Sequence, residues 1–210
     1  MSHEIYIFGS TTRGDVSPSS DVDVLVIPED NSNSEFPTAW SVYSKETLRS
    51  YFDSGRLFAW HLHLEAIRIF PRSGMSFLSE LGPPSSYKTA ATDISDLQLL
   101  LEQSLSELRR NTHSPVYELG LVYTAIRDIA MAASWAMLGN PSFSRYAPYQ
   151  LPEKCPLPLD VYESAMRARH ASTRGTPEPT NALDAALTIQ RSTVLDWTAS
   201  IRRKTCQTPF

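Results

Sequence analysis

Two aspartates near the N-terminus have the spacing of a metal site. Asp21 and Asp23 stand one residue apart in the run Asp21–Ile27, which is otherwise made of valine, leucine and isoleucine. Residues i and i+2 of a strand point to the same face, about 6.6 Å apart along the strand. Two like charges on an apolar strand are unfavourable without a cation, and carboxylates in this geometry can converge on Mg²⁺. The pair therefore predicts a magnesium site.

A glycine-serine pair precedes these acids. Gly9 and Ser10 directly follow the apolar run Ile5–Phe8, which has the composition of a buried strand. Glycine lets a phosphate approach the backbone, and the loop amides and the Ser10 hydroxyl can then donate to phosphate oxygens. With the two aspartates, this loop predicts a triphosphate cradle beside a metal platform. Ordinary turn chemistry is the alternative interpretation of the same residues.

The combined pattern resembles the minimal nucleotidyltransferases of the DNA polymerase β superfamily. Their signature is a strand ending in Gly-Ser, a following Arg-Gly, and then Ser-Asp-x-Asp on the next strand. Here it stands as Gly9-Ser10, Arg13-Gly14 and Ser20-Asp21-Val22-Asp23, and the resemblance covers about residues 4–70. It implies transfer of a nucleoside monophosphate from an NTP, most often ATP, to a hydroxyl group, with release of pyrophosphate.

The resemblance also implies roles for individual residues. Asp21 and Asp23 are expected to hold Mg²⁺ and to act in catalysis. Arg13 either touches phosphate or only braces the loop. The expected nucleotide-binding residues of the loop and the following strand are Gly9, Ser10, Arg13 and Ser20.

Active members of that family supply a third carboxylate from a later strand, and the expected third strand here, Trp40–Tyr43, contains no acid. Glu65, just before the predicted strand Ile67–Phe70, is the nearest alternative, although related sequences carry a glutamate there without a catalytic role. Two further hypotheses stay open. The base comes from the second half of the chain, or the protein is a catalytically impaired nucleotide-binding or antitoxin-like interaction module.

Three charged residues lie in a segment of the second half that is apolar nearly all round. Glu118, Arg127 and Asp128 belong to the predicted helix 114–138. A buried charge needs a partner, so an inter-helix salt bridge is the structural interpretation. In the functional interpretation, Glu118 or Asp128 is the base for the acceptor hydroxyl and Arg127 binds phosphate.

The elements that must position these residues change in character along the chain. Short β-type runs and one helix are predicted in the first part, and long segments of helical period in the second. The predicted strands are 5–8, 21–27, 40–43 and 67–70, and the predicted helices are 44–64, 93–111, 114–138, a helix from about 160, and 181–204.

This order predicts an α/β nucleotidyltransferase domain at residues 1–84, a small mixed sheet with flanking helices, followed by an all-α helical bundle at 85–210. The layout of the second part is similar to the bundles of kanamycin-type nucleotidyltransferases and to the HEPN partners of minimal nucleotidyltransferases.

Composition narrows the location and the partners. The 210 residues carry 19 basic and 23 acidic side chains, a net charge of −4 that argues weakly against a broad nucleic-acid surface. No run approaches the ~20 apolar residues of a membrane helix, and no signal sequence is visible. The two cysteines suggest neither a disulfide framework nor a metal site, which favours a cytoplasmic protein. The expected partners are an NTP and a hydroxyl-bearing acceptor, either a small molecule, a protein or an RNA end. A homodimer or a toxin-like protein partner stays open.

Overall fold

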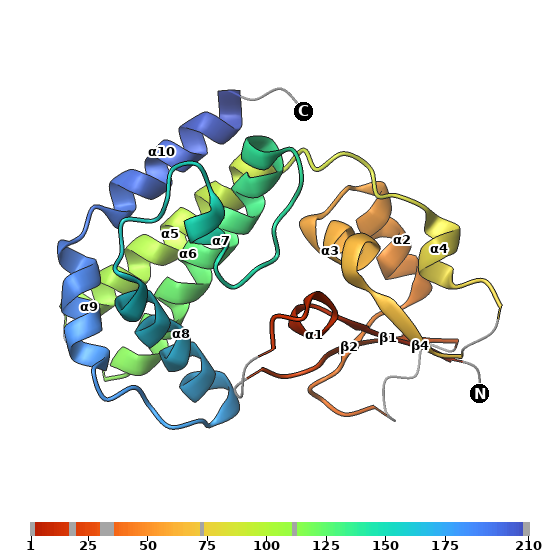
Figure 1. Cartoon of the computed structure of the whole chain (residues 1–210), viewed down its shortest axis with the longest axis horizontal. Helices are drawn as coiled ribbons and strands as arrows, with labels where there is room; N and C mark the ends of the chain where they lie inside the picture. The colour runs from red at the N-terminus through yellow and green to blue at the C-terminus, as the bar shows by residue number, and fades with distance from the viewer. Residues whose placement is uncertain (1–2, 17–19, 30–35, 72–73, 111–112, 208–210) are drawn as a thin grey trace. The chain divides into compact units, whose positions relative to one another are not determined.

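The computed structural model divides into two compact units, residues 1–88 and residues 89–210 (Figure 1). The structure describes residues 3–16, 20–29, 36–71, 74–110 and 113–207. The first unit carries the sheet and the second is helical, so the predicted fold class is confirmed.

The sheet of the N-terminal unit is mixed. Its strand order in the described part of the chain is β3-β2-β1-β4, and β1 is antiparallel to both β2 and β4. The strand β3 runs parallel to β2, with Leu25 opposite Ser41. The strands are β1 (His3–Phe8), β2 (Asp23–Pro28), β3 (Ser41–Val42) and β4 (Ile67–Phe70).

Helices cover one face of this sheet, as Figure 1 shows for α2 (Lys45–Asp53) and α3 (Leu57–Glu65). Alternate residues of β1 and β2 point to that face because the side-chain period of a strand is two residues. The short helix α4 (Phe77–Leu81) joins the same core. The core residues are Tyr6, Phe8, Leu25, Ile27, Leu48, Phe52, Ala59, Leu62, Phe77 and Leu78.

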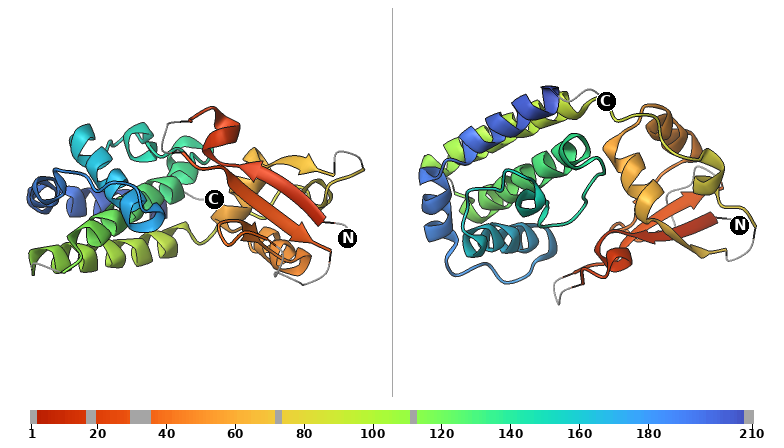
Figure 2. Two further views of the ribbon diagram at one scale, coloured as in Figure 1. Left: turned by 90° about the horizontal axis from the view of Figure 1, so that it is seen from below. Right: turned by 45° about the horizontal axis from the view of Figure 1, so that its top comes forward.

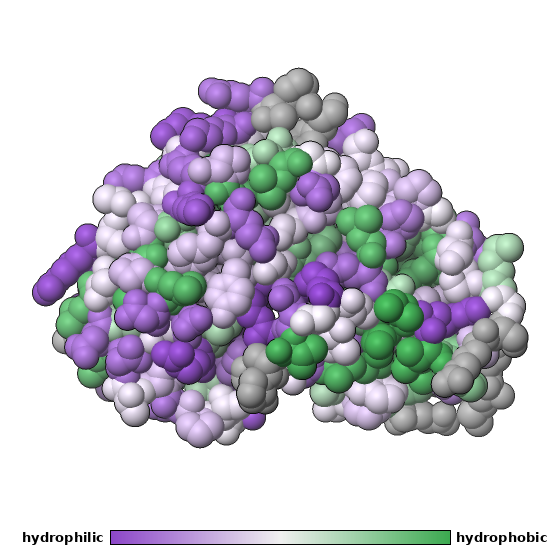
Figure 3. All heavy atoms as spheres, in the orientation of Figure 1, coloured by the Kyte–Doolittle hydropathy of each residue, from purple (hydrophilic) through white to green (hydrophobic). Residues whose placement is uncertain are grey.

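Among the described strands, β4 lies at one edge of the sheet, and its apolar side chains are partly exposed. Ile67, Ile69 and Phe70 are 53%, 43% and 47% exposed. Figure 3 shows hydrophobic atoms gathered over this part of the N-terminal unit. Its Arg68 side chain turns to the following loop, where it donates to the carbonyl oxygens of Gly74 and Met75.

The prediction of one helix over residues 44–64 was wrong, because the segment forms two helices, α2 and α3. Ser44 caps the first of them, as predicted, by accepting a hydrogen bond from the Thr47 amide at 3.2 Å. The break lies at Gly55, which has φ +64°. A Cβ there would lie 2.4 Å from the carbonyl oxygens of Ser85 and Ser86. A returning chain segment therefore packs directly on the backbone at the break.

The C-terminal unit is built around α6, which packs against α5 and α8 (Figure 2). Its residues Leu119, Val122 and Ile126 are fully buried, which confirms that this helix is central. A proline at its first position and Gly139 at its C-cap, with φ +76°, set its ends as expected. The helices are α5 (Ala90–Arg109), α6 (Pro115–Leu138), α7 (Ala147–Gln150), α8 (Leu159–Arg174), α9 (Ala182–Arg191) and α10 (Val194–Gln207).

The last predicted helix, 181–204, is also two helices. Between α9 and α10, the Ser192 hydroxyl donates to the Ile189 carbonyl at 2.6 Å and accepts from the Val194 amide at 3.3 Å. These local bonds offer the backbone an alternative to a continuing helix, which is why the chain turns here.

By length and composition alone, α6 could also cross a membrane, with a mean hydropathy of 1.2 over its most apolar stretch. Half of that stretch is buried inside the protein. A core helix has the same composition, and the packing of α5 and α8 against α6 accounts for its apolar residues.

Candidate active site

The glycine-serine loop and one of the two aspartates meet where β1 ends and β2 begins. Phe8 is the register partner of Asp23, and Gly9 follows immediately with φ +77°. A Cβ at Gly9 would lie 2.2 Å from Oδ2 of Asp23. The Asp23 carboxylate thus lies directly against the backbone of the turn, a position that only glycine permits.

The turn that follows is closed by its own hydrogen bonds. The Gly9 carbonyl accepts from the Thr12 amide at 3.2 Å, the Arg13 amide at 3.3 Å and the Thr12 hydroxyl at 2.9 Å. The resulting single helical turn, α1 (Ser10–Arg13), begins with the serine of the predicted cradle. Ser10 is therefore held next to the residue whose backbone touches Asp23.

Asp21 lies outside the strand, and the prediction that the strand begins there was wrong. The strand β2 starts at Asp23, while Asp21 and Val22 precede it and are exposed. Pairing stops at this point because β1 ends at Phe8 and the chain turns away at Gly9. Ser20 lies in the same irregular segment.

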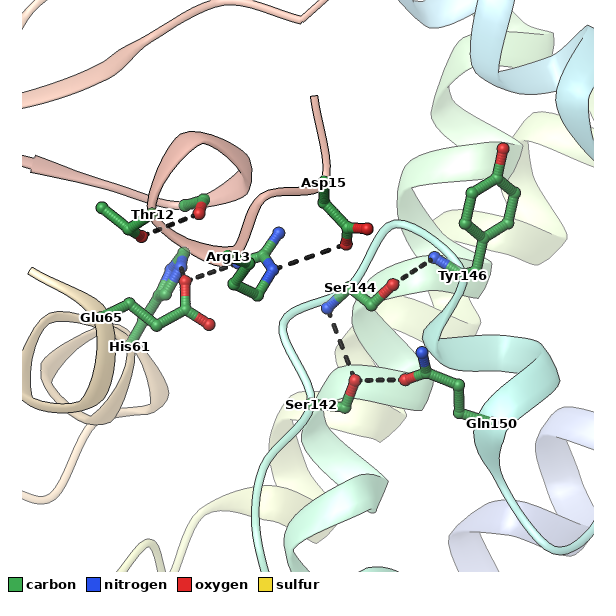
Figure 4. A network of polar contacts seen from close by, with 10 residues as sticks. Thr12, Arg13, Asp15, His61, Glu65, Ser142, Ser144, Tyr146 and Gln150 are labelled. Atoms are coloured by element: carbon green, nitrogen blue, oxygen red, sulfur yellow. Dashed lines mark hydrogen bonds and ion pairs between the residues drawn. The ribbon is translucent and has the colours of Figure 1, made fainter. Parts of the chain in front are cut away.

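Arg13 points to α3 rather than standing alone in the loop. Its Nη1 lies 2.5 Å from Oε2 of Glu65, and the same oxygen lies 2.9 Å from Nε2 of His61 (Figure 4). The side chains of Arg13, His61 and Glu65 are only 22%, 19% and 12% exposed. The Glu65 carboxylate therefore accepts hydrogen bonds from two residues that flank the loop in space.

The contact of His61 with Glu65 was not predicted from the sequence. The spacing of His61 to Glu65 is i, i+4, which places both on one face of α3, and this local signal could have been recognised. The contact of Glu65 with Arg13 carries no such signal, because 52 residues separate them.

The strand β3, where the third carboxylate was expected, contains no acidic residue. This strand lies beside β2, as expected for the family pattern, but consists of Ser41 and Val42. Within the described ranges, no group of three or more His, Cys, Asp and Glu side chains has the geometry of a metal site.

The donors that are present nevertheless fit Mg²⁺ in one particular way. Mg²⁺ is commonly bound by one or two carboxylates together with substrate phosphates and water, rather than by an all-protein cage. The Asp23 carboxylate lies against the backbone of the turn at Gly9, and Asp21 stands two residues earlier. This donor set suits a magnesium ion that arrives with the triphosphate.

The remaining candidates lie on α6, in the C-terminal unit. Nε of Arg127 lies 2.6 Å from Oδ1 of Asp128, its neighbour in the same helix, and the guanidinium stacks over the Tyr123 ring at 5.4 Å. Burial opposes the charge of Arg127, but the Asp128 carboxylate outweighs it and raises the pKa of the guanidinium above its ordinary value. Glu118 stands ten residues earlier, about 15 Å along the helix axis, so the two acids cannot serve one atom together.

The match with a protein family agrees with this geometry. Residues 2–71 match the model of the nucleotidyltransferase domain, which spans the sheet, the glycine-serine loop and both aspartates. The N-terminal unit therefore carries a nucleotidyltransferase domain. The resemblance inferred from the signature residues is confirmed.

One solved structure aligns with most of the chain at low similarity. The spectinomycin adenyltransferase of Enterococcus faecialis, crystallised with ATP and spectinomycin, aligns over 97% of this chain and 91% of its own length. Its sequence identity is 13% and the TM-score is 0.42. None of the curated proteins matches the sequence.

Proposed function

We propose that the protein transfers a nucleoside monophosphate from an NTP to a hydroxyl group in a Mg²⁺-dependent reaction that releases pyrophosphate. The observation that supports this most is the contact between the Gly9 backbone and the Asp23 carboxylate, which joins a phosphate-type loop to a metal-type acid. The match of residues 2–71 to the nucleotidyltransferase domain supports the same class of reaction.

In the proposed reaction, the acceptor oxygen forms a bond to the α-phosphorus and the bond from that phosphorus to the β-phosphate bridge breaks. Pyrophosphate leaves, and the proton of the acceptor hydroxyl passes to a base. Bound Mg²⁺ would neutralise charge on the phosphates. The chain itself contributes positioning. Gly9 and Ser10 would bind the phosphates, while Asp21 and Asp23 would hold the Mg²⁺ that the triphosphate carries.

The proposal also names candidates for the base and classes of acceptor. Glu118 and Asp128 are the predicted bases in the C-terminal unit, and each is tested by its own amide variant in the transfer assay. The acceptor carries a hydroxyl group, on a small molecule, a protein or an RNA end. ATP is the first NTP to test, and we place the reaction in the cytoplasm.

The first prediction concerns the two aspartates. Asp21→Asn and Asp23→Asn each keep the size of the side chain but remove its charge, so transfer should fall by roughly 100-fold or more, as for the loss of a major electrostatic contribution to catalysis. The measurement is label transfer and pyrophosphate release from labelled NTPs with a panel of acceptors, with Mg²⁺ and with a chelator. Asp53→Asn, an exposed acid at the end of α2, is the matched control and should retain activity.

Two outcomes would contradict this assignment. Activity that survives the combined Asp21→Asn and Asp23→Asn change would exclude the metal platform. Tight nucleotide binding by the unaltered protein, without transfer to any acceptor class, would instead favour the nucleotide-binding interaction module.

A further inference from the structure

We propose that Glu65 is a positioning residue that clamps the phosphate loop from both of its ends. The loop consists of Gly9 and Ser10, and the clamp consists of Glu65 with its two partners, Arg13 and His61. This inference rests on the proposed function, because it assigns the clamp to the same nucleotide site. It differs from a direct catalytic role, in which Glu65 would supply the missing third carboxylate.

One end of the clamp is the ion pair with Arg13. Arg13 is the last residue of α1, the helical turn that begins at Ser10, and its Nη1 lies 2.5 Å from the Glu65 carboxylate. Both side chains are largely shielded, at 22% and 12% exposed, so water screens this pair less than an ordinary surface pair. The pair fixes the far end of the turn to α3.

The other end of the clamp reaches the residue before the loop. His61 Nε2 lies 2.9 Å from the same Glu65 oxygen, and the imidazole packs edge-on against the Phe8 ring, with centroids 5.3 Å apart at 83°. Phe8 directly precedes Gly9 and is the register partner of Asp23. A single carboxylate oxygen therefore connects the residues on both sides of Gly9-Ser10.

Glu65 belongs to a helix that is anchored in the core. It is the last residue of α3, whose Ala59 and Leu62 are 0% and 1% exposed in the core between the helices and the sheet. A phosphate loop that is already held in its binding geometry loses less conformational entropy when the nucleotide arrives. The clamp should therefore act on the affinity for the NTP more than on the chemical step.

A double-mutant cycle tests this directly. Arg13→Gln, Glu65→Gln and the combined variant are compared for the Kd of the NTP, measured by equilibrium dialysis with Mg²⁺, and for KM and kcat. Each single change should weaken NTP binding by roughly 5–50-fold, the range of one shielded ion pair, while kcat stays within a few-fold. The combined variant should lose clearly less than the sum of the two single losses, since both changes break the Arg13–Glu65 contact; Arg13 also pairs with Asp15 at 3.7 Å, so a small further loss is compatible with the clamp.

Two companion variants sharpen the result. Arg13→Lys keeps the charge opposite Glu65 and should restore part of the affinity that Arg13→Gln loses. His61→Gln retains a hydrogen-bond donor and should weaken binding less than Glu65→Gln, because the Arg13 contact remains. Circular dichroism and thermal unfolding of every variant show that the fold is kept.

The matched control is an exposed ion pair elsewhere in the chain. Arg110 Nη1 lies 3.2 Å from Oε1 of Glu107, and these side chains are 73% and 47% exposed. Glu107→Gln also removes one carboxylate charge from an ion pair, yet it should leave NTP affinity, KM and kcat unchanged.

Three outcomes would overturn the clamp. Loss of kcat in Glu65→Gln, with the kcat of Arg13→Gln unchanged, would make Glu65 the missing third carboxylate rather than a positioning residue. Additive losses in the combined variant would show that Arg13 and Glu65 act separately. If the unaltered protein does not bind NTP, the proposed function itself is wrong. If it binds and transfers normally but the two single losses are additive, only the clamp is wrong.

Discussion

At the scale of single residues, Gly9 has the strictest geometric requirement in the site. Its φ of +77° lies in the left-handed region, and the space where a Cβ would stand is occupied by the Asp23 carboxylate. Gly14, five residues later, has nearly the same φ of +75° but no atom within 4 Å of its Cβ position. Gly9 also has ψ −145°, a conformation open essentially to glycine alone, whereas Gly14 with ψ 13° is an ordinary left-handed residue, so Gly9 has both the greater strain and the contact with the acid.

Gly9→Ala should therefore destabilise the fold by about 1–3 kcal/mol and also abolish NTP binding, because the new methyl group displaces Asp23. Gly14→Ala should show only the strain of a left-handed alanine, about 1 kcal/mol, and bind NTP normally. Urea unfolding gives the free energies, and equilibrium dialysis gives the affinities. Equal behaviour of the two variants would mean that the Gly9–Asp23 contact does not restrict the site.

At the scale of elements, α6 and α8 approach each other at a single glycine. A Cβ on Gly120 would lie 2.8 Å from Cα and 3.0 Å from the amide nitrogen of Arg169. Both atoms belong to backbone, which cannot move aside as a flexible side chain does. The close crossing of these helices therefore depends on the absence of a side chain at this position.

Gly120→Val should lower the free energy of unfolding by about 1–3 kcal/mol, because overpacking pushes α8 away from α6. The affinity of the N-terminal unit for NTP should be retained. Leu138→Val introduces the same β-branched residue at the exposed end of α6 and should change stability by only about 0.5 kcal/mol. Urea titrations monitored by circular dichroism compare the two. A neutral Gly120→Val variant would contradict the close crossing.

Local sequence patterns predicted where helices and strands lie better than where the long helices break. The mixed sheet, the capping Ser44 and the central helix that ends at Gly139 were all visible in local patterns. The two breaks, at Gly55 and at Ser192, were missed. The segments around them have helical composition, and at Gly55 the deciding contact is with Ser85 and Ser86, thirty residues away.

At the scale of the whole molecule, each unit buries a weakly acidic group. In the C-terminal unit, Cys155 is 5% exposed, and burial raises the pKa of its thiol from 9.0 to about 11. In the N-terminal unit, burial and the hydrogen bond to Glu4 raise the pKa of Tyr6 from 10.0 to about 12. In both cases the group keeps its proton in the folded protein up to a higher pH than in the unfolded chain.

Stability should therefore decline as the solution becomes alkaline. The contribution of Cys155 is fully present below the pKa of the unfolded thiol and is lost as pH rises from about 9 to about 11, by up to about 2–3 kcal/mol. Cys155→Ala should flatten this part of the decline in urea unfolding experiments. The exposed Cys206 provides the control, and Cys206→Ala should leave the decline unchanged. An equal slope in all three proteins would show that Cys155 is not the group responsible.

The sequence alone was enough to identify the nucleotidyltransferase domain at the N-terminus and to suggest the chemistry of its site. The signature Gly9-Ser10 with Asp21 and Asp23 needs only local spacing, and caps, prolines and strand runs need only short-range preferences. Tertiary structure decided which of these residues meet. The contact of Gly9 with Asp23 and the bonds of Glu65 to Arg13 and His61 arise from strand register and from packing of α3 on the sheet. The contacts of Gly9 with Asp23 and of Arg13 with Glu65 leave no periodic trace along the chain, because the fold as a whole sets them, whereas the i, i+4 spacing of His61 and Glu65 does leave a local signal.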